Sequence, residues 1–124
     1  MQDLITTLTS AAKEIPESKQ LGFGKYFSDH MFKLNFSEGL GWHRPRITPY
    51  SSIAIDPAAT VLHYGQALFE GMKCFRQTSG KLVLFRPDWN AKRLQEGAER
   101  LCMQAPPANL MIEGIKELIR VDQK

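Results

Sequence analysis

The sequence has little cysteine, no long apolar run and no secretion signal, and each of these shortages excludes a class of protein. Its two cysteines, Cys74 and Cys102, lie far apart in apolar surroundings, so buried free thiols are expected rather than a disulfide or a metal pair. That usage fits a reducing compartment. No segment reaches the apolar length needed to cross a bilayer, and the N-terminus lacks a charged start and an apolar core. The sequence therefore predicts a cytoplasmic protein that does not enter the membrane.

Charge of one sign is not concentrated anywhere in the chain. The net charge of +3 comes from 16 basic and 13 acidic residues spread along 124 positions, and no lysine or arginine run could track a phosphate backbone. Nucleic acid is therefore not an expected partner. With 43% hydrophobic and 23% charged residues, the composition is that of an ordinary globular domain with a modest core.

Motifs of hydrolases and metalloenzymes are missing as well. No GxSxG turn presents a serine nucleophile. His30, His43 and His63 are the only histidines, and none stands at metal-ligand spacing from another histidine or a cysteine, so we predict structural or surface imidazoles and no metal site. Lys73 could form a Schiff base with a carbonyl group, but nothing nearby would desolvate it or tune its charge, which favours a surface position.

Apolar spacing organises the first half of the chain. Residues 3–14 carry apolar side chains at helical intervals up to Pro16, which predicts an amphipathic helix. Alternation over residues 25–36 predicts a strand. The glycines and prolines of residues 37–50 predict an irregular connection, followed by a short extended piece at residues 52–55.

The second half gives clearer signals. Residues 72–86 predict a hairpin that turns at residues 77–80, with Gly80 at a positive φ. Two further amphipathic helices are expected, one after the hairpin with Asp88 or a neighbour as its cap, and one after the prolines at positions 106 and 107. This element order predicts an α+β fold, in which helices pack against an antiparallel sheet.

Candidate binding residues gather in "LHYGQALFEGMKCFR" (62–76) and "LFRPDWNAKRL" (84–94). Arg93 lies early in a predicted helix, where a guanidinium and backbone N–H groups can hold a phosphate, although an arginine at such a position taken alone is more often a solvated surface residue. Tyr64 and Phe69 could line an apolar pocket or could be core aromatics. Glu70 and Lys73 could form a local ion pair, which contributes little if exposed.

These stretches, together with "FSDHMF", "RPRITPY" and "AERLCM", resemble a known family. In order and spacing they are similar to the N-terminal small domain of branched-chain amino-acid aminotransferases, which are fold-type IV pyridoxal-phosphate enzymes. The resemblance covers residues 23–124. It implies an N-terminal helix or extension over residues 1–20 and the aminotransferase small domain over residues 21–124.

The resemblance also implies roles for individual residues. Arg93 matches the arginine that binds the phosphate of pyridoxal 5′-phosphate, for which charge pairing with a dianion is the physical reason. Tyr64 and Phe69 match aromatic positions that line the pocket for a branched aliphatic side chain, and Phe23 or Phe27 would complete that wall. Such a pocket favours Val, Leu and Ile by burial and rejects charged side chains by desolvation.

The reaction implied is transfer of an amino group from leucine, isoleucine or valine to 2-oxoglutarate by a homodimeric enzyme. In relatives the lysine that binds the cofactor lies in a second, larger domain, so no catalytic residue is assigned within these 124 positions, and the chain alone is expected not to transaminate. "LIRVDQK" stops directly after an apolar helix, which predicts a truncated chain.

Two alternatives stay open at this point. One lies in the same fold group, a D-amino-acid aminotransferase or an aminodeoxychorismate lyase, although the long segment before Leu62 fits the branched-chain subgroup better. The other is of a different class, a stand-alone binding or interaction domain without catalysis.

Overall fold

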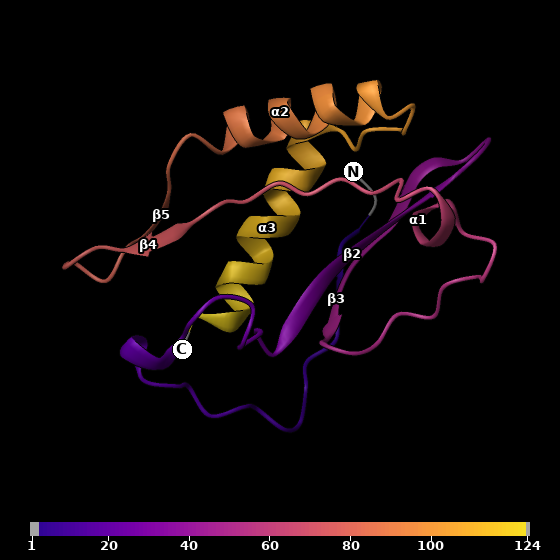
Figure 1. Cartoon of the computed structure of the whole chain (residues 1–124). Coiled ribbons are helices and arrows are strands. Elements are labelled where there is room, and N and C mark those ends of the chain that lie inside the picture. The colour runs from indigo at the N-terminus through magenta and orange to yellow at the C-terminus, as the bar shows by residue number, and fades with distance from the viewer. Residues whose placement is uncertain (1–2, 124) are drawn as a thin grey trace. The chain divides into compact units, whose positions relative to one another are not determined.

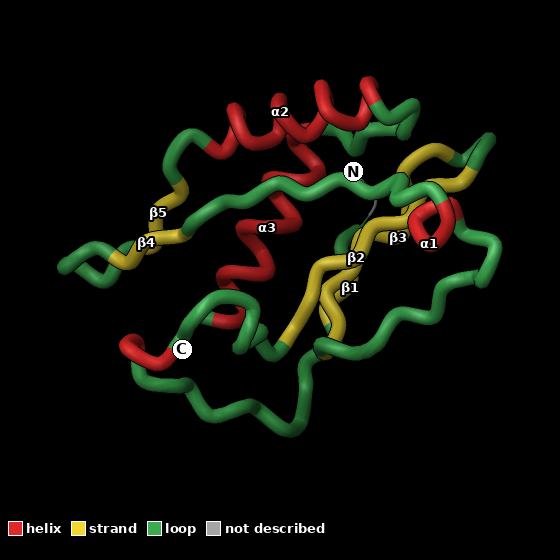
Figure 2. The backbone as a smooth tube through the Cα atoms, in the orientation of Figure 1, coloured by secondary structure: helices red, strands yellow, loops and turns green. Residues whose placement is uncertain are grey.

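A two-stranded hairpin with a third, short strand beside it forms the sheet of the first structural unit. The computed structural model describes residues 3–123, and the chain divides into two units, residues 1–52 with 114–124, and residues 53–113. In the first unit β2 (His30–Ser37) pairs antiparallel with β3 (Gly41–Pro49), and β1 (Ile5–Thr6) pairs parallel with β3. The order of the three strands in the sheet is β1-β3-β2, and Figure 2 draws them close together.

Of the strand predicted over residues 25–36, residues 30–36 are confirmed as part of β2 and residues 25–29 are irregular. The irregular connection predicted over residues 37–50 is wrong. Most of that segment is β3, because a bulge accommodates its proline. Lys33 pairs with Arg46 and Asn35 with His43, so β3 carries one residue more than β2 at this point. Arg44 takes up the extra length with a φ of 54°, and the bulge lets the chain pass Pro45, which has no N–H for a ladder, without ending the strand.

The helix predicted over residues 3–14 is also wrong. Backbone hydrogen bonds to other segments replace the internal bonds of a helix: Ile5–Thr6 pairs with β3, the Thr7 N–H donates to the carbonyl of Ile47 at 2.9 Å, and the Thr9 N–H donates to Nε2 of His30 at 2.9 Å. Three threonines in this stretch favour extended backbone. A short 3₁₀ turn at Ser18–Gln20 follows. No strand forms at residues 52–55, which are irregular.

The core of the first unit lies where α3 (Ala108–Asp122) packs on the sheet. Ile47 of β3 is fully buried. Gly114 of α3 lies directly against the ring of Phe32 on β2, leaving no room for a Cβ. The glycine thus sets how closely the helix approaches the strand. The helix predicted after the two prolines is confirmed.

The second unit contains the hairpin and the helix that the sequence predicts most clearly. Strands β4 (Cys74–Arg76) and β5 (Leu82–Leu84) pair antiparallel, and Gly80 in their turn has a φ of 83°, as predicted. A short helix, α1 (Thr60–His63), precedes them, and α2 (Pro87–Arg100) follows. Figure 1 marks these elements. Ala91 and Ala98 are the buried residues of α2.

The ends of α2 differ from expectation. Asp88 does not cap the helix: the N-cap residue is Arg86, in left-handed conformation, with Pro87 as the first helical residue and Asp88 inside the first turn. At the other end Cys102 has a φ of 54°. Its N–H bonds to the carbonyl of Glu99 and the Met103 N–H bonds to that of Ala98, at 3.1 and 2.8 Å. This pair of bonds is a Schellman motif, with cysteine at the position that usually carries glycine.

The cysteine prediction is half right. Cys74 and Cys102 are free, but both are exposed rather than buried, because one lies on a two-stranded hairpin and the other in the turn that ends α2. The α+β class is confirmed: the described residues contain two antiparallel strand pairs, a short parallel pair and helices, joined by irregular segments. Within those same residues, no helix has both the length and the apolar character of a membrane-spanning segment.

Candidate phosphate-binding site

The segment that follows Gly65 runs along α2 and turns every second side chain toward it. Gln66 donates through Nε2 to the carbonyl of Leu101 at 2.7 Å, at the end of the helix. Leu68 lies against Gly97, one turn earlier. Glu70 reaches the first half of the helix. Residues 66, 68 and 70 are half-buried while 67, 69 and 71 are exposed, so the alternation has the period of a strand.

Glu70 forms hydrogen bonds with Asn90 and Arg93. These two residues lie on one face of α2, because residues three apart on a helix are neighbours. Asn90 Nδ2 donates to Glu70 Oε1 and to the carbonyl of Gly71, both at 2.8 Å. Arg93 Nε donates to Glu70 Oε2 at 3.1 Å, and Arg93 Nη2 donates to Glu70 Oε1. The guanidinium of Arg93 thus contacts the Glu70 carboxylate side-on, and the side-chain amide of Asn90 donates to the same carboxylate.

The two members of this ion pair differ in exposure. The side chain of Glu70 is 16% exposed and that of Arg93 is 61% exposed. The bond from Arg93, followed by that from Asn90, lowers the pKa of Glu70 below its ordinary value, and the same bond raises the pKa of Arg93. Glu70 is therefore an anion at neutral pH, and the Arg93 guanidinium is a fixed cation with one edge open to solvent.

These contacts correct one prediction and refine another. Glu70 pairs with Arg93 instead of with Lys73, so the predicted local ion pair is wrong. Arg93 is the seventh residue of α2, about 9 Å along the axis from the first helical residue. Its guanidinium, rather than the first N–H groups of the helix, is the anion-binding group here. Asn90 and the contact of Glu70 with Arg93 were not predicted, because residues 66–70 alternate in burial against α2 but not in polarity along the sequence.

The aromatic residues assigned to a substrate pocket are surface residues in this chain. Phe23 is 98%, Tyr64 86% and Phe69 83% exposed, so the alternative that Tyr64 and Phe69 are core aromatics is wrong. Phe69 is exposed because it lies on the side of the extended segment that faces away from α2. Tyr64 follows α1 and precedes the turn at Gly65, whose φ is 62°.

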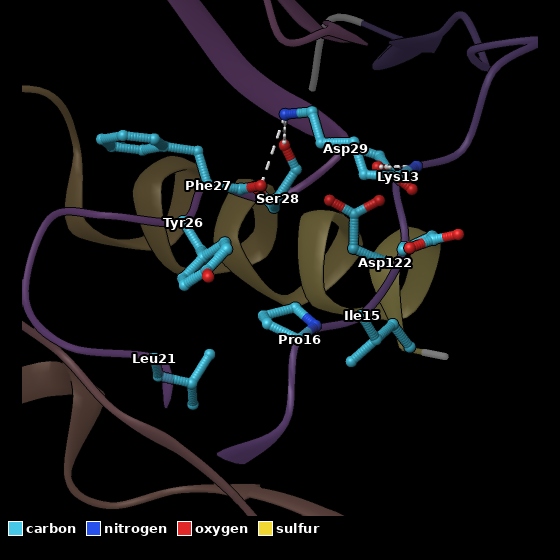
Figure 3. A pocket seen from close by; sticks show the side chains of 10 residues that line it. Lys13, Ile15, Pro16, Leu21, Tyr26, Phe27, Ser28, Asp29 and Asp122 are labelled. Carbon is cyan, nitrogen blue, oxygen red and sulfur yellow. Dashed lines mark hydrogen bonds between the residues drawn. The ribbon is translucent and has the colours of Figure 1, made fainter. Parts of the chain in front are cut away.

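A separate pocket of about 310 Å³ lies in the first unit (Figure 3). Its apolar wall includes Pro16, Leu21 and Phe27, and Phe27 also stacks on Tyr50 with ring centroids 5.1 Å apart. Lys13 Nζ, on the pocket's edge, donates to the carbonyls of Phe27 and Ser28 at 3.3 and 3.0 Å. The pocket's lysine is thus committed to internal bonds, and nothing at this site specifies a ligand.

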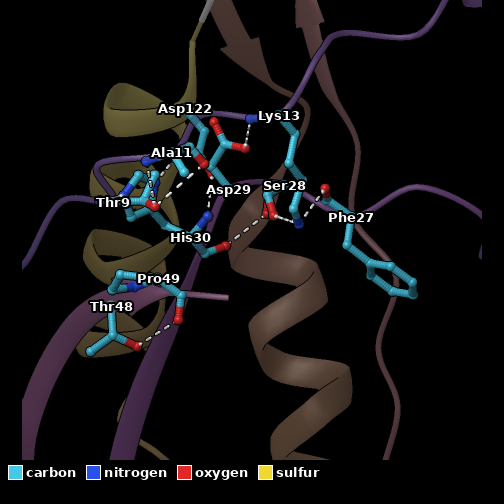
Figure 4. Close-up of polar contacts among 10 residues, drawn as sticks. All are labelled: Thr9, Ala11, Lys13, Phe27, Ser28, Asp29, His30, Thr48, Pro49 and Asp122. Carbon is cyan, nitrogen blue, oxygen red and sulfur yellow. Dashed lines mark hydrogen bonds and ion pairs between the residues drawn. The ribbon is translucent and has the colours of Figure 1, made fainter. Parts of the chain in front are cut away.

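Among the described residues of the first unit, His30 is a buried polar residue, and both of its ring nitrogens have hydrogen-bond partners (Figure 4). Its Nε2 accepts from the Thr9 N–H, so Nδ1 carries the proton and donates to Asp122 Oδ1 at 2.6 Å. Asp122 Oδ2 also accepts the backbone N–H of His30 at 3.1 Å. This cluster joins the N-terminal segment, β2 and α3. Within residues 3–123, no group of three or more histidine, cysteine, aspartate or glutamate side chains is placed to hold a metal ion.

Comparison with known proteins gives a consistent set of relatives. The chain is 46% identical over 111 residues to branched-chain-amino-acid transaminase 1 of Bacillus subtilis, 41% identical over 122 residues to branched-chain-amino-acid aminotransferase 2 of the same organism, and 48% identical over 103 residues to a branched-chain-amino-acid aminotransferase of Mycolicibacterium smegmatis. These alignments cover 90%, 98% and 83% of this chain. They cover 31%, 34% and 28% of the relatives, so the chain spans about a third of their length. No protein-family model matches.

Proposed function

We propose that this chain, which is homologous to branched-chain aminotransferases, forms the cofactor-phosphate side of the active site in an enzyme that moves the amino group of leucine, isoleucine or valine to 2-oxoglutarate. The cofactor would be pyridoxal 5′-phosphate, which supplies the electron sink for such a transfer. The observation that carries the proposal is Arg93: an oriented, solvent-facing guanidinium in a chain that is 41–48% identical to named aminotransferases.

The donor set around Arg93 fits a phosphate group. Guanidinium has five N–H donors in a planar fork, and the side-on contact with Glu70 uses those of Nε and one of Nη2. The Nη1 edge has no protein partner among the described residues and can donate to two phosphate oxygens. Arginine is always charged at physiological pH, so the attraction for a dianion does not depend on a proton transfer.

The remaining residues would bind and orient the substrate. Tyr64 and Phe69, with Phe23 or Phe27, would line the pocket for the branched side chain, and their exposure in this chain leaves those ring faces available to a ligand or to another part of the enzyme. Burial of an aliphatic side chain against such rings contributes roughly 25 cal/mol per Å² of apolar surface. Residues 21–124 would be the small domain and residues 1–20 an extension.

Other features of the proposal come from the family resemblance. The lysine that holds the cofactor would lie in the two thirds of such an enzyme that this chain does not span. Homodimer assembly is part of the proposal and is supported by the many large apolar side chains at the surface, Phe85 and Leu40 among them. A cytoplasmic location is supported by the two free, exposed cysteines, which suit a reducing compartment.

A chimera tests the proposal. This chain would replace the aligned third of the Bacillus subtilis transaminase 1, and the product would be assayed for leucine-dependent glutamate formation and for the dissociation constants of pyridoxal phosphate and of pyridoxal, which lacks the phosphate. Substituting Arg93→Ala is expected to weaken pyridoxal phosphate binding at least about tenfold, since a charged hydrogen bond is lost, and to leave pyridoxal binding unchanged.

Arg100→Ala is the matched control, because Arg100 lies in the last turn of the same helix. It should change neither dissociation constant. Equal affinity of the unsubstituted chimera for pyridoxal phosphate and pyridoxal would contradict the phosphate-binding role. The 124-residue chain alone is expected to form no glutamate.

The rival functions predict different results when the chimera is given other substrates. A D-amino-acid aminotransferase would prefer D-alanine to L-leucine, and an aminodeoxychorismate lyase would release pyruvate from its substrate. The relatives reported above all bear the branched-chain name, which is why leucine is tested first. A non-catalytic binding domain would leave the chimera inactive even with cofactor bound.

A further inference from the structure

We infer that Glu70 is a positioning residue for the cofactor phosphate: it acts through Arg93, holding the guanidinium by its Nε and Nη2 edge so that the Nη1 edge faces the ligand. The inference deepens the proposed function and rests on Arg93 being the phosphate-binding residue. Glu70 itself makes no contact with the phosphate.

The first support is the geometry of the pair. Both carboxylate oxygens of Glu70 contact the guanidinium, one through Nε and the other through Nη2. A two-point contact between planar groups fixes the direction of the guanidinium plane as well as its distance. An arginine side chain has four rotatable bonds and would otherwise lose rotamer freedom each time it bound a phosphate.

The second support is that Glu70 is itself held in place. Asn90 bonds to its Oε1 and to the carbonyl of the next residue, Gly71. Its neighbours two and four positions earlier, Leu68 and Gln66, are packed on or bonded to the same helix. The backbone that carries Glu70 is therefore fixed against α2, and the side chain of Glu70 is mostly buried, with 16% exposed.

The geometry also explains why Glu70 would not compete with the phosphate. The Nη1 edge lies on the far side of the guanidinium from Glu70, so the cation stands between the two anions and attracts each at shorter range than they repel one another. Orientation of the guanidinium by Glu70 adds to this attraction. Removing the negative charge should therefore weaken phosphate binding, although a purely electrostatic view predicts that it would strengthen it.

The test uses Glu70→Gln and Glu70→Asp in the chimera described above. The readout is the ratio of the dissociation constants of pyridoxal and pyridoxal phosphate, which isolates the phosphate, with the phosphorus-31 chemical shift of bound pyridoxal phosphate as a second measure. Glu70→Gln should lower this ratio roughly tenfold, the value of one charge-assisted hydrogen bond. In an Arg93→Ala background the same change should have no further effect.

Glu96→Gln is the matched control, because Glu96 lies on α2, the helix that carries Arg93, and forms an exposed ion pair with Lys92 at 3.8 Å. It removes the same charge and should leave the ratio unchanged. Glu70→Asp keeps the charge with a shorter side chain, so a partial effect is expected.

The outcomes separate this inference from the proposed function. If Arg93→Ala leaves the ratio unchanged, the phosphate role of Arg93 fails and the inference fails with it. If Arg93→Ala lowers the ratio but Glu70→Gln leaves it unchanged or raises it, only the positioning role is overturned. A drop in thermal stability without a change in the ratio would mean that Glu70 is merely structural.

A measurement on the 124-residue chain makes the geometry testable without the chimera. In a nitrogen-15 spectrum the Nε–H of Arg93 should be shifted downfield and exchange slowly with water, and Glu70→Gln should remove both properties. An Nε–H signal that already looks like that of a free arginine in the unsubstituted chain would overturn the inference.

Discussion

One carboxylate pair from each unit, Asp122 with His30 and Glu70 with Arg93, shows by comparison what burial does to such a pair. In the first unit Asp122 and His30 are both largely covered, and every donor and acceptor of the imidazole is used within the unit. In the second unit Glu70 is covered while Arg93 keeps an open edge. The first arrangement can only join segments, whereas the second can also bind a ligand.

The helix glycines of the two units also differ, in what an added side chain would meet. Gly114 of α3 faces the rigid ring of Phe32, whereas Gly97 of α2 faces the end of the flexible Leu68 side chain, whose Cδ1 lies 2.9 Å from the position of an added Cβ. The Phe32 ring therefore cannot move away from a Cβ added at Gly114, whereas the Leu68 side chain can move away from one added at Gly97.

The largest expected effect comes from Gly114→Ala. The added methyl group would overlap the Phe32 ring, and we expect a loss of about 3 kcal/mol in the free energy of unfolding, since overpacking that cannot relax costs this much. Chemical denaturation monitored by circular dichroism would measure it. Gly97→Ala is the control: movement of Leu68 and the better helix propensity of alanine, about 1 kcal/mol, should leave it near neutral. Equal losses at both glycines would remove the contrast between the units.

Asp122→Ala should be the next most damaging. It leaves the Nδ1–H and the backbone N–H of His30 without their acceptor, and an unsatisfied buried donor costs about 1–3 kcal/mol. We expect a loss of about 2 kcal/mol together with faster hydrogen exchange at Thr9, which depends on the His30 ring. Asp122→Asn, which keeps one acceptor oxygen, should lose less. Unchanged exchange at Thr9 would show that the cluster does not hold the N-terminal segment.

Cys102→Gly should stabilise the second unit. Cysteine occupies the left-handed position of the Schellman motif at the end of α2, with a φ of 54°, where a side chain costs roughly 1 kcal/mol relative to glycine. A gain of about that size in the unfolding free energy is expected. Cys74→Gly is the control, because it lies in a strand and glycine weakens strands. A loss of stability on Cys102→Gly would mean that the thiol makes a contribution beyond the turn.

The smallest effect is the pH dependence of the Glu70–Arg93 pair. The pKa of Glu70 is lowered by Arg93, so the carboxylate contributes stability above the ordinary glutamate range, and this contribution is lost as the pH falls through the lowered value. The difference in unfolding free energy between the unsubstituted chain and Glu70→Gln should be greatest near neutral pH and should vanish in strong acid. A difference that does not change with pH would show that the charge of Glu70 contributes nothing.

Local signals in the sequence predicted what depends on local interactions. The hairpin turn at Gly80, α2, α3 and the strand at β2 all follow from spacing and turn residues within a few positions. Arg93 was identified as the phosphate candidate from its place after the hairpin and from the family resemblance, and that role is still a prediction.

What the sequence did not reveal depends on distant partners. Residues 3–14 have the spacing of a helix, but pairing with β3, some forty positions away, decides their structure. Pro45 pointed to a loop, and only the register with β2 shows that a bulge accommodates it. Lys73 is the nearest basic residue to Glu70 in the sequence. In the fold Glu70 pairs with Arg93 instead, because alternate residues of its segment face α2.

The bulge in β3 also affects how this sheet meets other chains. An unpaired strand edge invites another strand to add to it, and in the described part of the chain β1 pairs with β3 at Arg46 and Ile47. In the first half of β3, with which β1 does not pair, the bulge twists the strand, and Pro45 has no N–H to donate to an incoming strand. These two features protect the middle strand against edge-to-edge aggregation where its own neighbour is too short to cover it.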